Sequence, residues 1–403
     1  MGHQKQQKRG AECPLDSPPK RIKSNKEEID EETNVEEVEE CPHTSPPMWT
    51  RASVEEVNDE EVIEISSQEN AQSVDLEEII YRPDSGTIFR YEQMGTKCYK
   101  FLVILDLFID SGVTAEGYIG KQIDQICSRR NMYARTKSCR LDDLVLNLWP
   151  KSEKRALPEN RVRIARILIG NMLIKKGYHE AAHVAGTVLG PFMSDLSTIG
   201  SMQNRFQVTR HQIRIEKKNN RILYQAELSH VEEAIQYKFR DRRLLEDSLS
   251  NSPSKGSRQG LTYQRLEILG DAVLDVLVVE YWSAVFPEAQ RSELLRLHTA
   301  STERSVLSAA SANLCLENYL NYNGGQKKVV MKIVEDLVLA KWQGKLTKNK
   351  TPYWVDLNIK NKILCDIFES LIGAVFVDSD FNMNTTRSVF KNTLSVLLSE
   401  YNI

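Results

Sequence analysis

The sequence predicts a mainly α-helical protein, with two helical blocks behind an irregular N-terminal tail. Three observations predict this class. Apolar residues recur at helical spacing from about residue 89 onward, strand-like alternating runs are few, and 403 residues give room for two ordinary domains. The chain has no apolar run of about 18 residues and no secretory signal at its N-terminus, so we expect an intracellular protein without a membrane span.

Residues 1–85 form the predicted tail, because they hold 9 Lys and Arg against 22 Asp and Glu and few aromatic residues. Such a segment cannot bury enough apolar surface to fold alone, so we expect it to be disordered. Its basic clusters between Lys5 and Lys23 resemble a bipartite nuclear-import signal, and the alternative is that they are ordinary solvated charges. We expect the protein in the nucleus or the cytoplasm. Residues 60–67, EEVIEISS, resemble a SUMO-interacting strand.

Beyond the tail the sequence has an excess of Lys and Arg, which favours a polyanionic partner such as nucleic acid. The seven cysteines are odd in number, irregularly spaced and without a CxxC pair. This pattern argues against a disulfide framework and against a thiolate zinc site, and it favours free thiols in a reducing compartment.

Helical periodicity divides the remainder of the chain. Residues 86–195 form the first block, with apolar helices such as CYKFLVILDLFI and RIARILIGNMLI. Residues 196–228 form a short connector with two strand-like runs, 203–215 and 221–228, around a turn-like KKNN. Residues 229–403 form the second block, with LEILGDAVLDVLVVEYW and DIFESLIGAVFV as its clearest helices.

Two pairs of acids stand out in the apolar helices of the second block. Glu267 and Asp271 are four residues apart, and Asp366 and Glu369 are three apart, so each pair lies on one helix face. Like charges among apolar neighbours repel and are costly to bury unless a cation compensates. Hard divalent cations take oxygen ligands, and a cation held by carboxylates can activate water and stabilise charge on a phosphate. The sequence therefore predicts a magnesium site.

The strings around these acids carry a resemblance. QRLEILGDAVLD, residues 264–275, resembles the signature helix of the ribonuclease III family, and DIFESLIGAVFVDS, residues 366–379, resembles its second metal-binding helix. HVEEAIQYKFRDRRLLEDSL, residues 230–249, resembles the opening helix and turn of the family. Gln264 and Lys362 are similar to the second nuclease domain of Dicer proteins. The resemblance covers residues 229 to about 400.

The resemblance implies a ribonuclease III-type endoribonuclease that hydrolyses RNA phosphodiester bonds in a Dicer-like silencing or degradation role. It implies that Glu267, Asp271, Asp366 and Glu369 bind Mg²⁺, with Mn²⁺ able to substitute, and that Lys362 contacts a phosphate or the transition state. Gly270 and Gly373 would then permit a close approach of the two helices. Double-stranded RNA is the expected substrate.

Two features depart from the family. Thr302, Glu303 and Arg304 occupy a slot where the family usually has an asparagine-containing helix that contacts RNA. The stretch between the two motifs interleaves lysines with aromatic residues, which suits either a surface that tracks an RNA strand or a solvated insertion. The residues are Lys341, Lys345, Lys348 and Lys350 with Trp342, Tyr353 and Trp354. Cleavage of single-stranded RNA therefore stays an alternative.

The first block resembles a decayed copy of the second. Superposing the LIG of residues 168–170 on the LIG of residues 371–373 places Arg166 opposite Glu369 and Arg163 opposite Asp366. Aligning residues 99–110 on 263–274 places Val103 opposite Glu267 and Leu107 opposite Asp271. Arginine cannot ligate magnesium, so this copy is predicted to be inactive and to serve as a packing partner.

Such a duplication predicts an intramolecular pseudodimer with one active site. The alternative is a homodimer, in which the second blocks of two chains pair and form two active sites. A scaffold that binds RNA without cutting it is the main rival function, and retention of all four acids argues against it. The remote rival is a zinc metallopeptidase, because GYHEAAHVAG places His179 and His183 one helical turn apart.

Overall fold

The computed structural model describes residues 86–109, 116–137, 141, 157–189, 228–250, 263–320, 324–347 and 352–399. Every regular element in these ranges is a helix, so the predicted fold class is confirmed for this part of the chain. The tail of residues 1–85, with its Lys5 to Lys23 clusters and residues 60–67, lies outside the described residues. So do the strand-like runs before Leu228. The expectations for these segments and the domain boundaries stay predictions.

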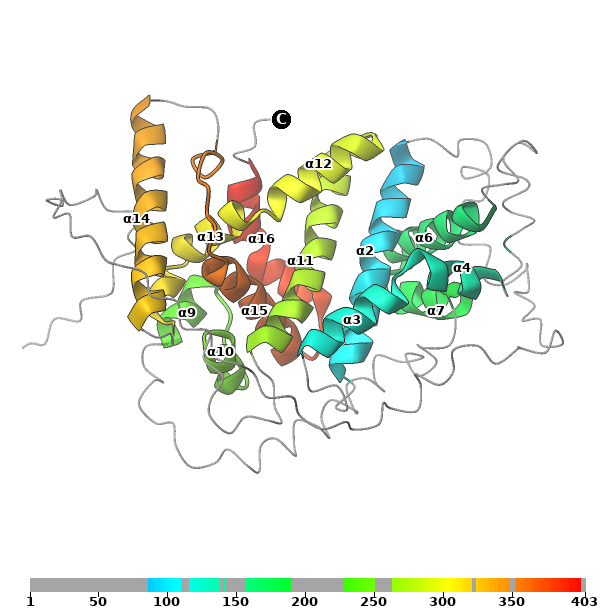
Figure 1. Cartoon of the computed structure of the whole chain (residues 1–403), viewed down its shortest axis with the longest axis horizontal. Coiled ribbons are helices and arrows are strands. Elements are labelled where there is room, and N and C mark those ends of the chain that lie inside the picture. The colour runs from blue at the N-terminus through cyan, green and yellow to red at the C-terminus, as the bar shows by residue number, and fades with distance from the viewer. Residues whose placement is uncertain are drawn as a thin grey trace, which may run out of the picture.

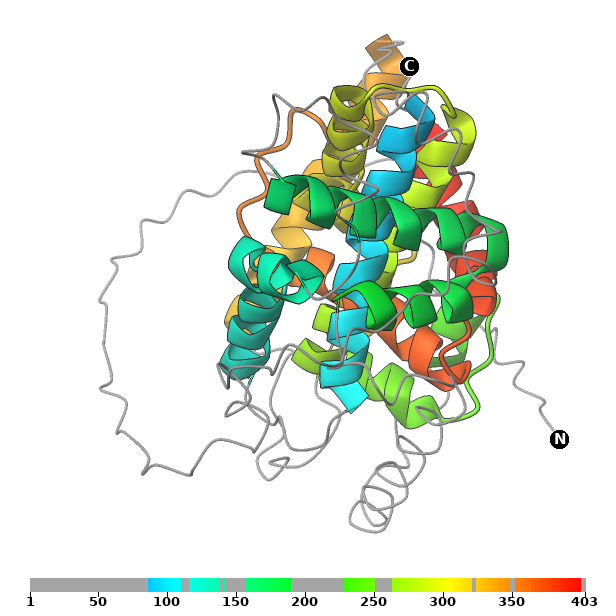
Figure 2. The ribbon, with the colours of Figure 1, turned by 90° about the vertical axis from the view of Figure 1, so that its right-hand side faces the viewer.

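The first half consists of five described helices. They are α2 (Gly86–Ile109), α3 (Glu116–Ile126), α4 (Arg129–Lys137), α6 (Leu157–Lys176) and α7 (Tyr178–Leu189). Helix α2 is the centre of this half, because 16 of its residues are buried between α6 and the second half. Turned by 90°, the ribbon shows α6 crossing α2 (Figure 2).

The second half is built around one fully buried helix. Its elements are α9 (Leu228–Ala234), α10 (Arg242–Ser248), α11 (Tyr263–Val285), α12 (Arg291–Ser301), α13 (Arg304–Asn313), the 3₁₀ turn η6 (Leu316–Asn318), α14 (Gly324–Thr347), α15 (Ile363–Asp378) and α16 (Met383–Ser399). Every residue of α15 is buried, because α10, α11, α13 and α16 all pack against it. A helix surrounded in this way must be apolar on nearly all sides, as DIFESLIGAVFV is.

The predicted opening helix and turn form α9, a turn and α10, and the C-terminal end of α15 anchors the turn. The buried carboxylate of Asp378 accepts hydrogen bonds from the backbone N–H groups of Arg240 at 2.8 Å and Asp241 at 2.9 Å. It also accepts one from the Tyr237 hydroxyl at 2.9 Å. These bonds fix the start of the second half against its central helix.

The α11–α15 crossing is so close that only glycine fits at its centre. A Cβ atom added to Gly270 would lie 1.7 Å from the carbonyl oxygen of Glu369, and one added to Gly373 would lie 2.2 Å from the carbonyl oxygen of Leu266. No side chain tolerates such distances. The close approach expected at Gly270 and Gly373 is therefore present.

The first half contains the same crossing. A Cβ atom added to Gly95 of α2 would lie 1.7 Å from the carbonyl oxygen of Arg166, and one added to Gly170 of α6 would lie 1.9 Å from the carbonyl oxygen of Tyr91. The reciprocal contacts match those of Gly270 and Gly373 position by position. They support the duplication and keep the predicted pairing of Arg166 with Glu369 and of Arg163 with Asp366.

The same contacts correct the register predicted for α2. Because Gly95 takes the place of Gly270, Glu92 is the counterpart of Glu267 and Thr96 is the counterpart of Asp271. The expectation that Val103 and Leu107 hold these positions was wrong by eleven residues. The physical reason is that a long apolar helix repeats its pattern every turn, so apolar matches alone do not fix a register. One acid of the first copy therefore survives.

Helices α2 and α11 lie side by side in the middle of the molecule and join the two halves (Figure 1). The Arg265 guanidinium donates to the carbonyl oxygen of Phe108 at 2.5 Å, and the Phe101 ring packs edge-on against Phe376. Glu280 accepts a hydrogen bond from the Tyr178 hydroxyl of the first half at 2.8 Å, and it also pairs with Arg387 of α16. The halves thus pack within one chain.

Within the described residues, no helix combines the length and the apolar character needed to cross a membrane.

Candidate active site

The four predicted carboxylates come together at the α11–α15 crossing. Helix α11 supplies Glu267 and Asp271, and α15 supplies Asp366 and Glu369. Three of these acids, Glu267, Asp271 and Glu369, line an open pocket of about 250 Å³ at the border with the first half. It is lined by Glu267, Ile268, Asp271 and Glu369 of the second half and by Lys100, Ile104, Gly120, Ile123 and Asp124 of the first.

Lys362 lies at the N-terminal end of α15, over two of the acids. Its Nζ is 3.0 Å from Oδ2 of Asp366 and 3.4 Å from Oε1 of Glu267. The carboxylate of Asp366 is nearly buried, whereas the Lys362 side chain is 63% exposed. Lys362 can therefore rotate into solvent and leave two oxygen ligands free for a cation.

Crowding and burial make the carboxylates hard to ionise in the absence of a cation. Burial raises the pKa of Glu267 to about 7. The negative charge of Asp366 also raises this pKa, whereas Lys362 lowers it. Burial and then Asp271 and Asp366 raise the pKa of Glu369 to about 9. Burial also raises the pKa values of Asp271 and Asp366. Four acids that resist ionisation side by side are an arrangement that a divalent cation would stabilise.

Cys365 is a neighbour of the site that the sequence did not single out. Its Sγ, a carboxylate oxygen of Asp366 and one of Glu369 lie within 4.8 Å of one another, and the thiol donates to Oε1 of Glu369 at 3.4 Å. Burial raises the pKa of the thiol far above its ordinary value, so it stays protonated. A protonated thiol is a poor ligand for a hard cation, so the oxygen atoms define the site.

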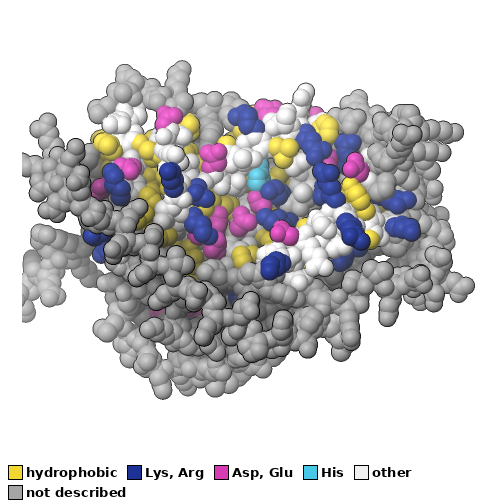
Figure 3. Space-filling model, in the orientation of Figure 1, with side chains coloured by type: hydrophobic (Ala, Val, Ile, Leu, Met, Phe, Trp, Pro, Cys, Tyr) yellow, Lys and Arg dark blue, Asp and Glu magenta, His cyan; other side chains and the backbone are white. Residues whose placement is uncertain are grey.

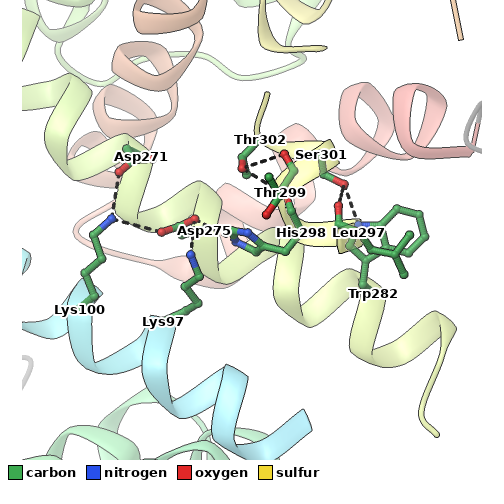
Figure 4. Close-up of polar contacts among 10 residues, drawn as sticks. All are labelled: Lys97, Lys100, Asp271, Asp275, Trp282, Leu297, His298, Thr299, Ser301 and Thr302. Atoms are coloured by element: carbon green, nitrogen blue, oxygen red, sulfur yellow. Dashed lines mark hydrogen bonds and ion pairs between the residues drawn. The ribbon is translucent and has the colours of Figure 1, made fainter. Parts of the chain in front are cut away.

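Two lysines of α2 enter the site from the first half (Figure 4). The Nζ atom of Lys100 lies 3.3 Å from Oδ2 of Asp271 and 3.3 Å from Oδ2 of Asp275, and Nζ of Lys97 lies 3.0 Å from Oδ1 of Asp275. His298 of α12 also contacts Asp275, with Nε2 2.9 Å from Oδ1. Burial would raise the pKa of Asp275, but His298 and the two lysines lower it, so Asp275 stays ionised.

Sequence reasoning missed Lys97, Lys100 and His298, because they lie far from the second motif in the chain. A usable signal was present, since two lysines three residues apart share one face of a helix with a long apolar run, where an acidic partner would be favourable. Asp275, one turn beyond Asp271, was the complementary signal on α11.

The slot of Thr302, Glu303 and Arg304 is the junction of α12 and α13. Thr302 ends α12, Glu303 precedes α13, and the Arg304 guanidinium donates to the carbonyl oxygen of Lys360 at 2.8 Å. Lys360 is two residues before Lys362. Arg304 therefore holds the segment that carries Lys362 at the site.

The lysine-aromatic stretch forms α14 and the segment of residues 352–362. Trp354 is fully buried, Tyr353 packs edge-on against it, and Lys341 lies over the Tyr353 ring. The idea that Trp354 offers an open face to RNA bases was wrong, because the core already uses that face. Nothing is described for the side chain of Lys345, and Lys348 and Lys350 lie outside the described residues, so their RNA contact stays a prediction.

The two histidines of the HEAAH string are exposed on α7. Nδ1 of His179 lies 3.3 Å from Oε1 of Glu180, and His183 has exposed surface. Among the described residues, the three-ligand cluster is the one formed by Cys365, Asp366 and Glu369. The histidines therefore gain no third ligand from the described part of the chain.

The positions of the first half that correspond to Glu267 and Asp366 hold an ion pair. Glu92 is buried, and its carboxylate accepts a hydrogen bond from Nε of Arg163 at 3.0 Å, while Arg291 of α12 approaches to 3.3 Å. An arginine at the Asp366 position thus neutralises the surviving acid. Figure 3 shows acidic side chains in the middle of one face, with Lys and Arg side chains beside them and across the right-hand half.

The carboxylates of two crossing helices, three of which line an open pocket, offer oxygen ligands of the kind that divalent cations take. Residues 264–380 match the family model described as Ribonuclease III domain, and this range contains all four carboxylates and Lys362. The chain therefore carries a ribonuclease III domain, as its motifs predict.

The similar proteins include Dicer-like ones. Ribonuclease 3-like protein 3 of Oryza sativa subsp. japonica is 32% identical over 178 residues, which are 43% of this chain and 55% of the relative. Protein Dicer of Schizosaccharomyces pombe is 28% identical over 232 residues, which are 57% of this chain and 16% of the relative. The chain thus spans about half of the first relative and a small part of the second.

The solved structures found in the comparison include a Giardia Dicer, with a TM-score of 0.42 and 12% identity over 76% of this chain and 54% of that one. The nuclease domain of ribonuclease III from Campylobacter jejuni has a TM-score of 0.32 and 22% identity over 44% of this chain and 99% of that one.

Proposed function

We propose that the protein is a magnesium-dependent endoribonuclease with one active site per chain, formed by Glu267, Asp271, Asp366 and Glu369. The observation that carries the proposal is the convergence of these acids at the α11–α15 crossing, where Glu267, Asp271 and Glu369 line a pocket that opens to solvent. Four clustered carboxyl groups with raised pKa values, three of them lining an open pocket, are typical of a functional site rather than of a structural ion pair.

The oxygen ligands fit Mg²⁺, and Mn²⁺ could substitute because it also prefers carboxylates. A bound divalent cation would lower the pKa of a water molecule and stabilise negative charge on the phosphate. The residues of the chain supply the remaining functions. The carboxylates would hold the cation and can accept a hydrogen bond from the attacking water. Lys362 is placed to contact a phosphate oxygen or the leaving group once it rotates away from Asp366.

The substrate we propose is RNA, with a duplex expected from the ribonuclease III domain. The Thr302 to Arg304 slot motivates a single-stranded RNA arm in the test, because Arg304 is bound to the backbone of Lys360 rather than displayed as an RNA contact. A role in RNA silencing or degradation belongs to the same proposal and is supported by the likeness to Dicer-like proteins.

The test is cleavage of labelled duplex, nicked and single-stranded RNA by the full chain, with Mg²⁺ and with EDTA. Glu267→Gln and Asp366→Asn should each reduce cleavage by at least about a hundredfold, because each removes a charged ligand while keeping the shape. Glu288→Gln, an exposed acid outside the pocket, is the matched control. RNA binding without cleavage by the wild-type chain would favour the scaffold function. Cleavage that is unchanged in both ligand variants would contradict the site.

A further inference from the structure

Lys100 introduces a fixed positive charge from the first half into the pocket of the second. Its ammonium group lies 3.3 Å from both Asp271 and Asp275, and the residue lines the same pocket as Glu267 and Glu369. The ammonium group of Lys100 therefore lies where a cation bound to these carboxylates could lie.

Lys100 differs from Lys362 in how firmly it is held. The Lys362 side chain is 63% exposed at a helix end, whereas that of Lys100 is 37% exposed and rises from the middle of α2. Asp275 is not one of the four proposed metal ligands, so it can keep its contact with Lys100 when Asp271 turns toward a cation. Both acids that Lys362 contacts, Glu267 and Asp366, belong to the four. A cation entering the pocket can displace Lys362 into solvent more readily than Lys100.

The ammonium group of Lys100 lies beside Asp271, at the place where a second divalent cation held by Asp271 would have to bind. Many nucleases hold two metal ions about 4 Å apart. A second ion beside Asp271 would lie against the fixed charge of Lys100 and be repelled.

We propose that Lys100 is a positioning residue that takes the place of a second divalent cation at Asp271, so that the site holds one tightly bound ion. The inference rests on the proposed function and deepens it. The first half, which has lost its own carboxylate cluster, then completes the site of the second half by supplying one of its positive charges.

The test is Mn²⁺ binding to the full chain without RNA, measured by electron paramagnetic resonance and calorimetry. Wild-type protein should bind one Mn²⁺ at the site. Lys100→Met removes the charge and keeps the length of the side chain, so it should bind a second ion, with an affinity at least about tenfold above any second binding event in the wild type. Lys100→Arg keeps the charge and should bind one.

Lys97→Met is the matched control, because Lys97 pairs with Asp275 on the same helix and does not contact Asp271. It should bind one ion. Two ions bound by the wild type, or one by a folded Lys100→Met, would overturn the role of Lys100 and leave the proposed function intact. The wild-type stoichiometry decides this even if Lys100→Met does not fold. Absence of Mn²⁺ binding in both proteins would overturn the proposed metal dependence itself, and this inference with it.

Discussion

At the scale of single residues, Glu92 and Arg163 show how the first half differs from the second at its helix crossing. In the second half, carboxylates stand at both of the corresponding positions, Glu267 and Asp366. In the first half Arg163 stands at the Asp366 position and donates to the surviving acid, so the ion pair is formed within the protein. The side chain of Glu92 is only 4% exposed, so the carboxylate is contacted by arginine rather than by water.

Arg163→Ala should therefore destabilise the protein. Removal of one partner of a buried ion pair leaves an uncompensated charge, and because Arg291 still approaches Glu92 we expect a loss of about 2 kcal/mol in the free energy of unfolding. Adding Glu92→Gln should recover most of this loss, since no buried charge then remains. Urea denaturation of the two single variants and the double variant measures the coupling. Additive losses would contradict the pairing.

The raised pKa values of Glu267 and Glu369 predict how stability depends on pH. Both titrate near 4.5 in the unfolded chain, but near 7 and 9 in the fold. Between these values the folded protein keeps protons that the unfolded chain releases. Their stabilising contribution is thus fully present below pH 4.5 and is lost as pH rises toward 9. Thermal unfolding in EDTA at pH 5, 7 and 9 should show the decline.

Saturating Mg²⁺ should suppress that decline, because it stabilises the ionised carboxylates. The variant carrying both Glu267→Gln and Glu369→Gln is the control, and its EDTA curve should be flatter than that of the wild type. The pKa shifts of these two acids would be contradicted if, in EDTA, the wild type became more stable between pH 5 and pH 9 and the double variant did not.

At the scale of elements, the sequence was most informative where motifs fix a register. The repeated LIG string aligned α6 with α15 correctly, because its glycine lies at the closest point of the crossing. Helix α2 was aligned on its apolar pattern, which every turn repeats, and the register was wrong. The better anchor was RYEQMG of residues 90–95, which parallels RLEILG of residues 265–270 and keeps arginine, glutamate and glycine in place.

The two crossings predict matched effects of adding one methyl group. Gly270→Ala and Gly95→Ala each place a Cβ atom 1.7 Å from a carbonyl oxygen, so each should destabilise the protein by about 3 kcal/mol or more or prevent folding. Gly186→Ala in α7 is the control, because it meets nothing within 4 Å. It should stabilise by about 0.5–1 kcal/mol through helix propensity. A mild effect at Gly95 would mean that the first half lacks the close crossing.

At the scale of the whole molecule, the charges between α2 and α11 favour pairing of unlike halves. The glycine register makes Lys100 the counterpart of Asp275. In a homodimer of second halves, Asp275 of each copy would take the place of Lys100 and face the acids of the other copy. The negative charges of the two copies would then repel each other. Four carboxylates near one another in the second half were predictable from its motifs. The pairing of Lys100 with Asp271 was not predictable, because the two residues are 171 positions apart in the chain.

The pairing of unlike halves predicts a nicking enzyme. With one intact carboxylate cluster per chain, a duplex bound across both halves meets the ion pair of Glu92 and Arg163 where a second site would be. Single-turnover cleavage of a duplex labelled differently on its two strands should give one cut strand per duplex. Light scattering should give a mass near 46.1 kDa, that of one chain. Paired cuts on both strands, together with twice that mass, would instead establish a homodimer whose two intact sites act at once.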